Sequence, residues 1–259
     1  MSEVLDPRML LRGYAAGIFP MADSRDASDI FWVEPRTRAI IPLDGFHCSR
    51  SLAHRLRQGR FAVTADRAFH DVLLGCADRD ETWINPMIER ATLGLHATGH
   101  AHSVECWHAN DSGQLRLVGG VYGVKLGRAF FGESMFSRMT DASKVALAWL
   151  IARLKVGNYT LLDCQFMTDH LASLGAVTVS REAYVGSLSA ALGSMGVSGS
   201  AGGGTGAPLG LAGSASVADG PALLPPDFGA LDRLLDAPGV AGASAPAGQL
   251  IAQLLGHTS

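Results

Sequence analysis

The sequence lacks a long apolar run, and its charges nearly cancel. No segment approaches the roughly 20 consecutive apolar residues that a transmembrane helix needs. The start, MSEVLDPRML, does not have the basic and then apolar order of a secretory signal. We therefore expect a cytoplasmic protein with no membrane partner. The formal net charge of −3 excludes the strongly basic class of nucleic-acid-binding proteins, although it leaves room for a local basic patch.

Cysteine is also scarce, and no C-x-x-C pair occurs. The four cysteines are Cys48, Cys76, Cys106 and Cys164. Such scattered thiols indicate reduced, buried side chains and not disulfides or a zinc knuckle. His96, His100 and His102 lie near Glu105, but their spacings fit no standard zinc set. We expect neither a metal ion nor another cofactor.

The chain has enough apolar residues for a real core, except near its end. Hydrophobic residues make up 47% and charged residues 17% of the sequence, which excludes disorder throughout. From Gly193 to Gly220, however, the sequence is rich in Gly, Ala and Ser, which is typical of a flexible linker. Beyond it, ALDRLLDA and QLIAQLLG are compatible with short amphipathic helices or with weak, transient ones. We assign residues 193–259 to a flexible tail without a function of its own.

The remaining pattern predicts a mixed sheet flanked by helices. A small N-terminal unit, residues 1–43, has a helix over PRMLLRGYAA and a short strand between Pro35 and Pro42. In residues 44–192, alternation from 101 to 137 predicts an antiparallel meander. Helical spacing then alternates with strands, which gives the order helix, strand, helix, strand, helix. The predicted fold class is α/β (α+β).

The segment Leu115–Ser137 is the most unusual part of the meander, because several glycines interrupt its apolar alternation. Glycines in strands mark bends or places where a ligand or another backbone approaches closely. Glu133 and Ser134 lie here among aromatic residues, and a carboxylate in apolar surroundings needs a partner. The alternatives are a tight hairpin with Glu133 exposed at its rim, or an ion pair from Glu133 to Arg128 or Arg138.

Another polar pair lies on the apolar segment LLDCQF. If this segment is a strand, Asp163 and Gln165 share one face and lie about 7 Å apart, close enough to act on one substrate group. The alternative is a pair at the sheet edge that binds a loop.

The most basic segment is a predicted helix in HCSRSLAHRLRQGRF. Its arginines are spaced so that some project from one side, which suits contact with phosphates or, alternatively, a solvated face. They are Arg50, Arg55, Arg57 and the following Arg60. Among the tryptophans, Trp83 in the loop ETWIN is the best exposed candidate for stacking on a base, whereas Trp149 lies in mid-helix.

A mixed sheet of this order is analogous to that of the acyl-CoA acetyltransferases. Those enzymes bind pyrophosphate with a glycine-containing loop, Q/R-x-x-G-x-G/A, that leads into a helix N-terminus. The corresponding segment, Arg138–Ser143, has neither glycine and carries Asp141 where a phosphate would lie. We therefore disfavour CoA and expect another acyl carrier.

The sequence resembles the bacterial leucyl/phenylalanyl-tRNA–protein transferases. The matching motifs run in the family's order from about Leu11 to Tyr184 and are highly specific together. They are GYAAGIFPM, WVEPRTRAIIP, SRSLAHRL, TWI, GHAHSVECW, LVGGVYGVKLGRAFFGESMFS, ASKVAL, LDCQ and HLASLGA. The resemblance implies an acetyltransferase-like domain behind a small N-terminal one, and an aminoacyl-tRNA as the acyl carrier.

The implied reaction moves Leu, Phe or sometimes Met from tRNA to the N-terminal amine of a protein that begins with Arg or Lys, which creates a degradation signal. The resemblance implies that Asp163 and Gln165 are the catalytic pair and that Glu133 lies near the reacting end. We hypothesise that Asp163 polarises Gln165, whose amide oxygen accepts a hydrogen bond from the amine. Asp163 as the sole base is disfavoured, since an ordinary carboxylate is weakly basic.

The resemblance also implies an apolar pocket for the aminoacyl side chain around Val121, Phe130 and Met135, with Ser134 beside it. Some relatives carry a Trp after GIFP that stacks near the terminal adenosine of the tRNA. Here Met21 stands at that position, and we include it with Trp83 among the substrate-binding residues. We expect a monomer, because nothing in the sequence demands a partner chain. The alternatives are a peptidoglycan-type aminoacyl-tRNA-dependent transferase and a noncatalytic RNA-binding module.

Overall fold

The computed structural model describes residues 5–193, 224–238 and 247–256, and its helices and strands follow the predicted order. In chain order the elements are α1 (Pro7–Ala15), β1 (Phe19–Met21), β2 (Phe31–Val33), β3 (Thr37–Ile40), η1 (Leu43–Gly45), α2 (Arg50–Gln58), β4 (Ala62–Ala65), α3 (Phe69–Ala77), α4 (Pro86–Ala97), β5 (Ala101–Ala109), β6 (Leu115–Leu126), β7 (Ala129–Ser137), α5 (Ala142–Val156), β8 (Leu161–Asp163), α6 (Asp169–Ser173), β9 (Val177–Ser180), α7 (Arg181–Leu192), α8 (Ala230–Asp236) and α9 (Ala247–Gly256). Within these ranges, no helix combines the length and the apolar character that crossing a membrane requires.

Seven strands form one mixed sheet in the order β4-β5-β6-β7-β8-β3-β9, and β1 pairs with β2 separately. Neighbouring strands are antiparallel except β7 and β8, which run parallel. Parallel neighbours need a long crossover connection, and α5 supplies it between these two strands. The predicted fold class, a mixed sheet flanked by helices, is confirmed.

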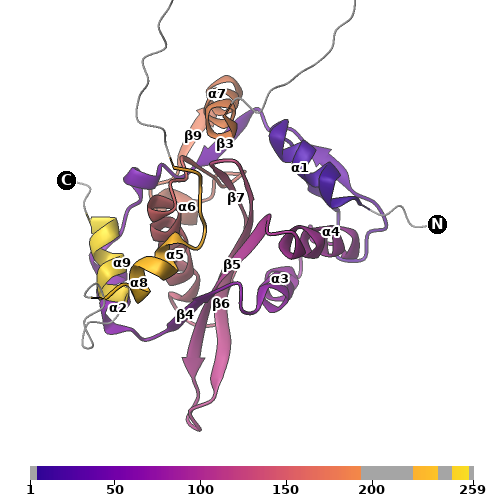
Figure 1. Cartoon of the computed structure of the whole chain (residues 1–259). Helices are drawn as coiled ribbons and strands as arrows, with labels where there is room; N and C mark the ends of the chain where they lie inside the picture. Colours follow the sequence, from indigo (N-terminus) through magenta and orange to yellow (C-terminus); the bar gives the residue numbers. More distant parts are fainter. Residues whose placement is uncertain (1–4, 194–223, 239–246, 257–259) are drawn as a thin grey trace, which may run out of the picture.

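The two faces of the sheet carry separate hydrophobic cores. Side chains alternate along β7, so the fully buried Phe130 and Phe131 enter different cores. The first core includes α5, α2, α8 and α9, and the second includes α1, α3, α4 and α7. Figure 1 shows the first group of helices on one side of the sheet and α1, α3 and α4 on the other. Helix α5 is apolar on almost every side because both the sheet and the C-terminal helices cover it.

Strand β3 belongs to the large sheet, although its residues fall within the predicted N-terminal unit, residues 1–43. It forms as predicted between Pro35 and Pro42, but pairs antiparallel with β9 and with β8. The middle residues of the strand, Arg38 and Ala39, are both buried. A charged side chain buried as deeply as that of Arg38 needs a counter-charge close by.

The strand predicted across LLDCQF is shorter than expected, because β8 ends at Asp163. Gln165 has a positive φ of 58°, which is incompatible with a continuing strand. The prediction that Asp163 and Gln165 share one face of a strand is therefore wrong. They are close for another reason: the backbone N–H of Gln165 donates to Oδ1 of Asp163 at 2.9 Å.

The C-terminal segment is partly folded onto the core, which corrects the assignment of all of residues 193–259 to a flexible tail. Helices α8 and α9 pack against α5, and α9 also packs against α2. Phe228, Leu231, Ile251 and Leu255 are buried in the first core. The helical alternative for ALDRLLDA and QLIAQLLG is thus the right one, because their apolar faces meet a helix that lacks other cover. Most of the predicted linker lies outside the described residues.

We predict that Leu231→Ala lowers the free energy of unfolding by about 2–5 kcal/mol, because it removes a fully buried side chain and leaves a cavity. Urea unfolding followed by circular dichroism measures this difference. Leu224→Ala is the matched control, since Leu224 is 71% exposed in the same segment and its truncation should change stability by less than about 0.5 kcal/mol. Equal stability of the two variants would contradict the packing of α8 on the core.

Candidate active site

Glu133 is set apart from its neighbours by a bulge between β6 and β7. Tyr122 pairs with Ser134 and Gly123 pairs with Gly132, so Glu133 has no partner residue on β6. A β-bulge redirects the side chain of the extra residue, and bulges occur frequently beside active sites. A side chain at Gly123 would collide with the backbone oxygen of Phe131, since its Cβ would lie 2.2 Å away. The glycines of this segment therefore allow the two strands to approach closely around Glu133.

Gln165 reaches Glu133 from the end of β8. The strands β7 and β8 are parallel, and Phe131 lies opposite Asp163, so Glu133 and Gln165 follow at the same edge. The Gln165 Nε2 atom donates to Oε1 of Glu133 at 2.9 Å. Gln165 also lines the pocket beside Glu133, so its Oε1 can accept a hydrogen bond from a substrate there.

Arg38 and Asp163 form a buried ion pair behind Gln165. Arg38 is 2% exposed and Asp163 is fully buried. The guanidinium donates from Nε to Oδ1 at 2.9 Å and from Nη2 to Oδ2 at 2.7 Å. The Tyr184 hydroxyl donates to Oδ2 at 2.9 Å, and the backbone N–H of Gln165 donates to Oδ1. The carboxylate of Asp163 is therefore saturated with hydrogen bonds, and none of them comes from the Gln165 side chain.

Aromatic rings hold Arg38 in place. Its guanidinium lies 4.6 Å from the ring centre of Phe19 and 4.8 Å from that of Tyr184, and Nη1 donates to the backbone oxygen of Gly17 at 3.2 Å. These contacts join the N-terminal segment, β3, β8 and α7 at one point. Sequence reasoning assigned no role to Arg38 or Tyr184. The one available signal was a charged residue in the middle of the apolar strand TRAI.

The surroundings of Glu133 strongly favour its protonated form. Burial raises the pKa of Glu133 to about 8, and the nearby charge of Asp163 raises it as well. Hydrogen bonds from Tyr14 and Gln165 and the positive charge of Arg38 only partly oppose this shift in pKa. Glu133 thus changes its charge near neutral pH, as a group that exchanges a proton with substrate must.

The ion-pair partners considered for Glu133 lie elsewhere. Arg138 pairs with Asp78 at 3.3 Å, and Arg128 donates to the backbone oxygen of Leu224 at 3.2 Å. The alternative of a rim-exposed Glu133 is also wrong, because the residue is 9% exposed. In the parts of the chain with described coordinates, no three His, Cys, Asp or Glu side chains gather as metal ligands would.

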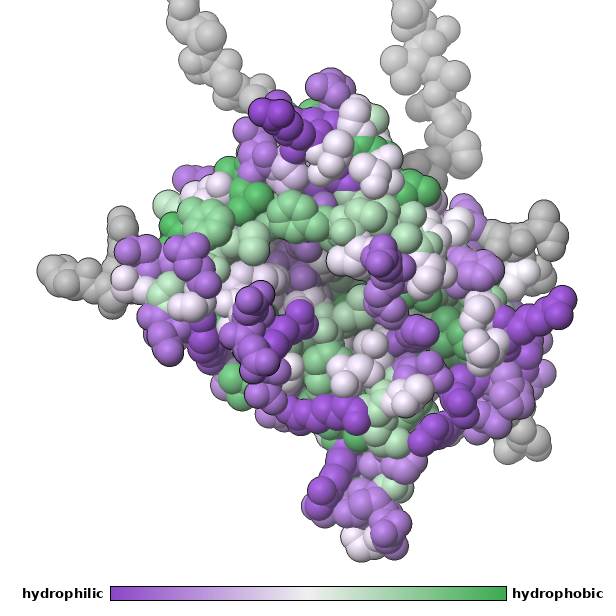
Figure 2. All heavy atoms as spheres, turned by 180° about the vertical axis from the view of Figure 1, so that it is seen from behind, coloured by the Kyte–Doolittle hydropathy of each residue, from purple (hydrophilic) through white to green (hydrophobic). Residues whose placement is uncertain are grey.

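A small apolar pocket of about 80 Å³ opens beside Glu133 and Gln165. Three predicted residues, Val121, Ser134 and Met135, line it. Residues that sequence reasoning did not single out complete the wall: Gly132, Leu147, Leu150, Leu162, Cys164 and Leu171. Leu147 and Leu150 belong to α5. The sequence shows them only as two of many apolar residues in that helix, so it does not indicate that they line a pocket. On the face opposite to that of Figure 1, the molecular surface is hollowed near its centre, between the end that carries α7 and the β5–β6 hairpin (Figure 2).

The other predicted substrate-binding residues do not line this pocket. Phe130 is fully buried in the first core, where it is stacked on Phe228 with ring centres 5.8 Å apart. Trp83 and Met21 are half-buried at the edge of the second core. Ser134 accepts a hydrogen bond at 2.8 Å from Arg79, which also donates to the backbone oxygen of Met135 and so fixes the rim of the pocket.

The predicted basic helix is α2, on the other side of α5 from this pocket. The Ser49 side chain caps its N-terminus, and Gly59 ends it with a φ of 60°. Arg50, Arg57 and Arg60 are exposed, as a phosphate-binding role requires. Arg55 is half-buried instead, where it donates to Asp141 at 3.3 Å and to Gln58 at 3.1 Å.

Known proteins match the chain over nearly its whole length. The family model for leucyl/phenylalanyl-tRNA protein transferase matches residues 40–189, and that for its N-terminal domain matches residues 3–36. A leucyl/phenylalanyl-tRNA–protein transferase of Rhizorhabdus wittichii is 55% identical over 99% of this chain and 100% of its own length. One of Novosphingobium aromaticivorans is 51% identical over 99% of this chain and 98% of its own length.

Among solved structures, that of FemX overlaps 66% of each chain with a TM-score of 0.45 and 11% identity. The family assignment depends on the two family models and on the high identity to full-length relatives, and it agrees with the resemblance in the sequence motifs. The chain therefore belongs to the leucyl/phenylalanyl-tRNA–protein transferase family.

Proposed function

We propose that this chain transfers Leu, Phe or Met from charged tRNA to the N-terminal amine of proteins that begin with Arg or Lys. The transfer takes place in the cytoplasm and creates a degradation signal. One observation carries the proposal: Glu133 and Gln165 form part of the wall of an apolar pocket. An apolar side chain in this pocket has its ester carbonyl at the polar rim, beside groups that can bind an amine.

The reaction needs a positioned amine more than it needs a strong catalyst. The amine nitrogen attacks the ester carbonyl, the bond from that carbon to the ribose oxygen breaks, and an amide forms. The tRNA leaves with a free ribose hydroxyl. An α-amine has a pKa of about 7.7–8.0, so much of it is protonated at neutral pH and must lose a proton before attack. Holding the two reactants together and accepting this proton are therefore the tasks of the site.

In this proposal Glu133 and Gln165 contact the acceptor amine. The Oε1 of Gln165 accepts a hydrogen bond from the amine, and the ionised form of Glu133, which is the minor form at neutral pH because its pKa is about 8, accepts the proton. The pKa of Glu133, about 8, matches that of the amine, so proton transfer in either direction is easy. This revises our hypothesis that Asp163 polarises the Gln165 amide, because Glu133 and not Asp163 accepts the hydrogen bond of that amide. Asp163 is a positioning residue that fixes the backbone of Gln165.

The apolar lining of the pocket supports a preference for apolar side chains such as those of Leu, Phe and Met. Its wall is formed by Val121, Met135, Leu147, Leu150 and Leu162 with other apolar groups. Each methylene that fits or clashes in such a pocket changes binding by about 1–3 kcal/mol, which gives good but incomplete selectivity. Trp83 stays a proposed stacking platform for a base of the tRNA, and Met21 stays a proposed substrate contact.

The tRNA body binds along α2 in this proposal, and Arg57 provides a clean test. We predict that Arg57→Gln weakens tRNA binding and reduces the slope of log K against log salt by about one, because one phosphate contact is lost. Filter binding at several salt concentrations measures the slope. The matched control is Arg90→Gln, an equally exposed arginine on α4, over the other face of the sheet. A slope equal to that of the wild type would remove Arg57 from the interface.

A transfer assay tests the whole proposal. Leucyl-tRNA labelled in the amino acid is mixed with a peptide that begins with Arg, and with the same peptide acetylated at its N-terminus. We expect labelled peptide only from the free amine. Binding of tRNA without product would favour an RNA-binding module, and product only with a cell-wall precursor would favour the peptidoglycan-type transferase. Product from the acetylated peptide would contradict attack by the N-terminal amine.

A further inference from the structure

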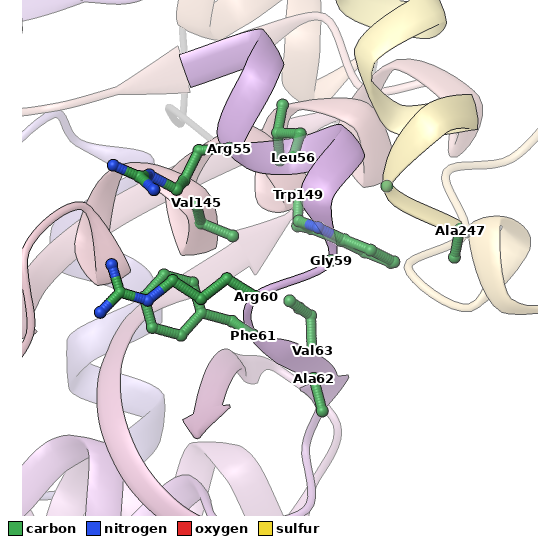
Figure 3. Close-up of a pocket in the computed structure, with 11 residues that line it drawn as sticks. Arg55, Leu56, Gly59, Arg60, Phe61, Ala62, Val63, Val145, Trp149 and Ala247 are labelled. Carbon is green, nitrogen blue, oxygen red and sulfur yellow. The ribbon is translucent and has the colours of Figure 1, made fainter. Parts of the chain in front are cut away.

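Another pocket, of about 340 Å³, lies where α2 ends and the chain turns into β4 (Figure 3). Helix α5 forms its floor with Val145 and Trp149, and the first turn of α9 forms one wall with Ala247 and Gly248. The remaining wall comes from the end of α2 and from β4. This pocket lies on the side of α5 away from the proposed active site.

The pocket combines an apolar interior with a cationic edge. Phe61, Val63, Leu56 and Trp149 form the apolar lining, to which the largely buried rings of Phe61 and Trp149, 6% and 8% exposed, contribute only their edges. The charged residues in its lining are Arg55 and Arg60, and no carboxylate is among the lining residues. Figure 3 shows both guanidinium groups on one side of the pocket, directed away from Ala247. A ligand with a flat apolar part and an attached anion fits this arrangement, and a nucleotide is such a ligand.

Arg55 and Arg60 differ in their charged partners. Arg55 is paired with Asp141 at 3.3 Å, so its charge is partly compensated. Arg60 lies over the ring of Phe61 at 5.7 Å, and in the described parts of the chain it forms no ion pair. The exposed Arg50 and Arg57 extend the positive surface along α2. The charge around the pocket therefore continues the surface assigned to the tRNA phosphates.

The C-terminal helix is held firmly at this place. A side chain at Gly248 would put its Cβ 2.0 Å from the backbone oxygen of Leu56, so α9 touches the backbone of α2 as only a glycine allows. The small side chain of Ala247, next to this contact, leaves the pocket open. The close contact at Gly248 fixes the distance between α9 and α2 at this wall of the pocket.

We propose that this pocket receives one unpaired base of the tRNA, packed against the apolar lining that includes Trp149 and Phe61, while Arg60 and Arg55 bind the adjoining phosphates. This inference depends on the proposed function. To the phosphate contacts of the tRNA it adds a base contact whose strength depends only weakly on salt. Contacts between a base and aromatic or apolar side chains show little sequence preference, and loss of one such contact weakens binding by roughly 10- to 100-fold. Phosphate contacts, in contrast, account for the salt dependence.

The test fills the pocket from its two opposite walls. Ala247→Phe acts from α9 and Val63→Phe from β4, and Ala247→Ser is the matched control with little added volume. We expect each phenylalanine variant to bind tRNA about 10- to 100-fold more weakly, with the wild-type slope of log K against log salt. Ala247→Ser should bind like the wild type. Thermal unfolding of each variant shows which ones are folded. Because one substitution lies in α9 and the other in β4, a local distortion of one element cannot explain weaker binding by both variants.

The outcomes separate the inference from the proposed function. Unchanged affinity in the folded phenylalanine variants, with the wild type still active in transfer, would overturn the base pocket alone. Weaker binding with a shallower salt slope would also overturn it, because the variants would then act through the arginines. If the variants lose transfer to the peptide but keep their tRNA affinity, the pocket belongs to the acceptor protein. A wild type that binds no tRNA would overturn both proposals.

Discussion

Asp163→Ala should lower the free energy of unfolding by about 3–5 kcal/mol, because it leaves the Arg38 guanidinium buried without its counter-ion. Arg38 is 2% exposed and Asp163 is fully buried, so solvent screens their interaction very little. Tyr184 and the backbone of Gln165 lose their acceptor in the same variant. Chemical denaturation of the wild type and the variant measures the difference.

A double variant separates the loss of this ion pair from the loss of volume. Replacing both partners by apolar residues, Arg38→Met with Asp163→Leu, removes the uncompensated charge and should restore much of the stability. Transfer activity should not return, since Gln165 no longer has the hydrogen bond that fixes its backbone. A double variant with normal activity would show that the position of Gln165 does not depend on Asp163.

A second control addresses the hydroxyl of Tyr184. Tyr184→Phe keeps the ring beside Arg38 and removes only one hydrogen bond to a charged acceptor, which is worth about 1.5–3 kcal/mol. A loss as large as that of Asp163→Ala would mean that the ion pair itself contributes little. The order of the two effects therefore tests which interaction holds this junction together.

The fold could be predicted because its signals are local. Alternation with period two predicts the meander, and the change to helical spacing after residue 140 predicts α5; both follow from neighbouring residues. The two C-terminal helices were ambiguous for a physical reason. A short amphipathic helix is marginal by itself, and α8 and α9 are stabilised by the surfaces of α5 and, for α9, of α2, which lie far away in the sequence.

The site could be predicted only in part. Glu133 stood out because a carboxylate among aromatic residues is unfavourable without partners. Arg38 did not, because its partner Asp163 is 125 residues away. Asp163 and Gln165 were identified as neighbours, but through a strand that ends before Gln165. Residue types can therefore indicate a polar site, whereas the contacts that decide the role of each residue depend on the tertiary fold.

Phe130 shows that the contacts of apolar residues, too, depend on the tertiary fold and cannot be predicted from the local sequence. Its neighbours Val121 and Met135 line the active-site pocket as expected, but Phe130 points to Phe228. The segment that carries Phe228 follows the glycine-rich region, and nothing in the local sequence connects the two. Phe228, in the segment that we predicted to be a flexible tail, thus packs against Phe130, which we had assigned to the substrate pocket.

Glu133→Gln should reduce kcat about 10²- to 10⁴-fold, because the variant cannot accept the proton of the acceptor amine. Glutamine keeps the size of the side chain and an oxygen that can still accept from Gln165. Steady-state transfer of leucine to an Arg-initiated peptide at saturating tRNA measures kcat. Glu105→Gln is the matched control: it makes the same replacement at another fully buried strand glutamate, which accepts hydrogen bonds from Thr64 and Ser103 outside the proposed site.

The same variant has a stability signature that needs no substrate. The pKa of Glu133 is about 8 in the folded protein, against an ordinary value of 4.5. Between these pH values the folded state keeps a proton that the unfolded state has released, so the stability due to Glu133 is complete at low pH and is lost as pH rises. The wild type should therefore lose stability relative to Glu133→Gln from about pH 5 to pH 8, by at most about 1.4 kcal/mol per pH unit.

Urea unfolding of both proteins across this pH range gives the difference directly. Groups that titrate alike in the two proteins cancel in it, so the change with pH reports Glu133. A difference that stays constant from pH 5 to pH 9 would mean that Glu133 is already ionised in the folded state. It would then be too weak a base to take a proton from an amine with a pKa of about 8, and Gln165 would have to act with a base from the substrate or from water.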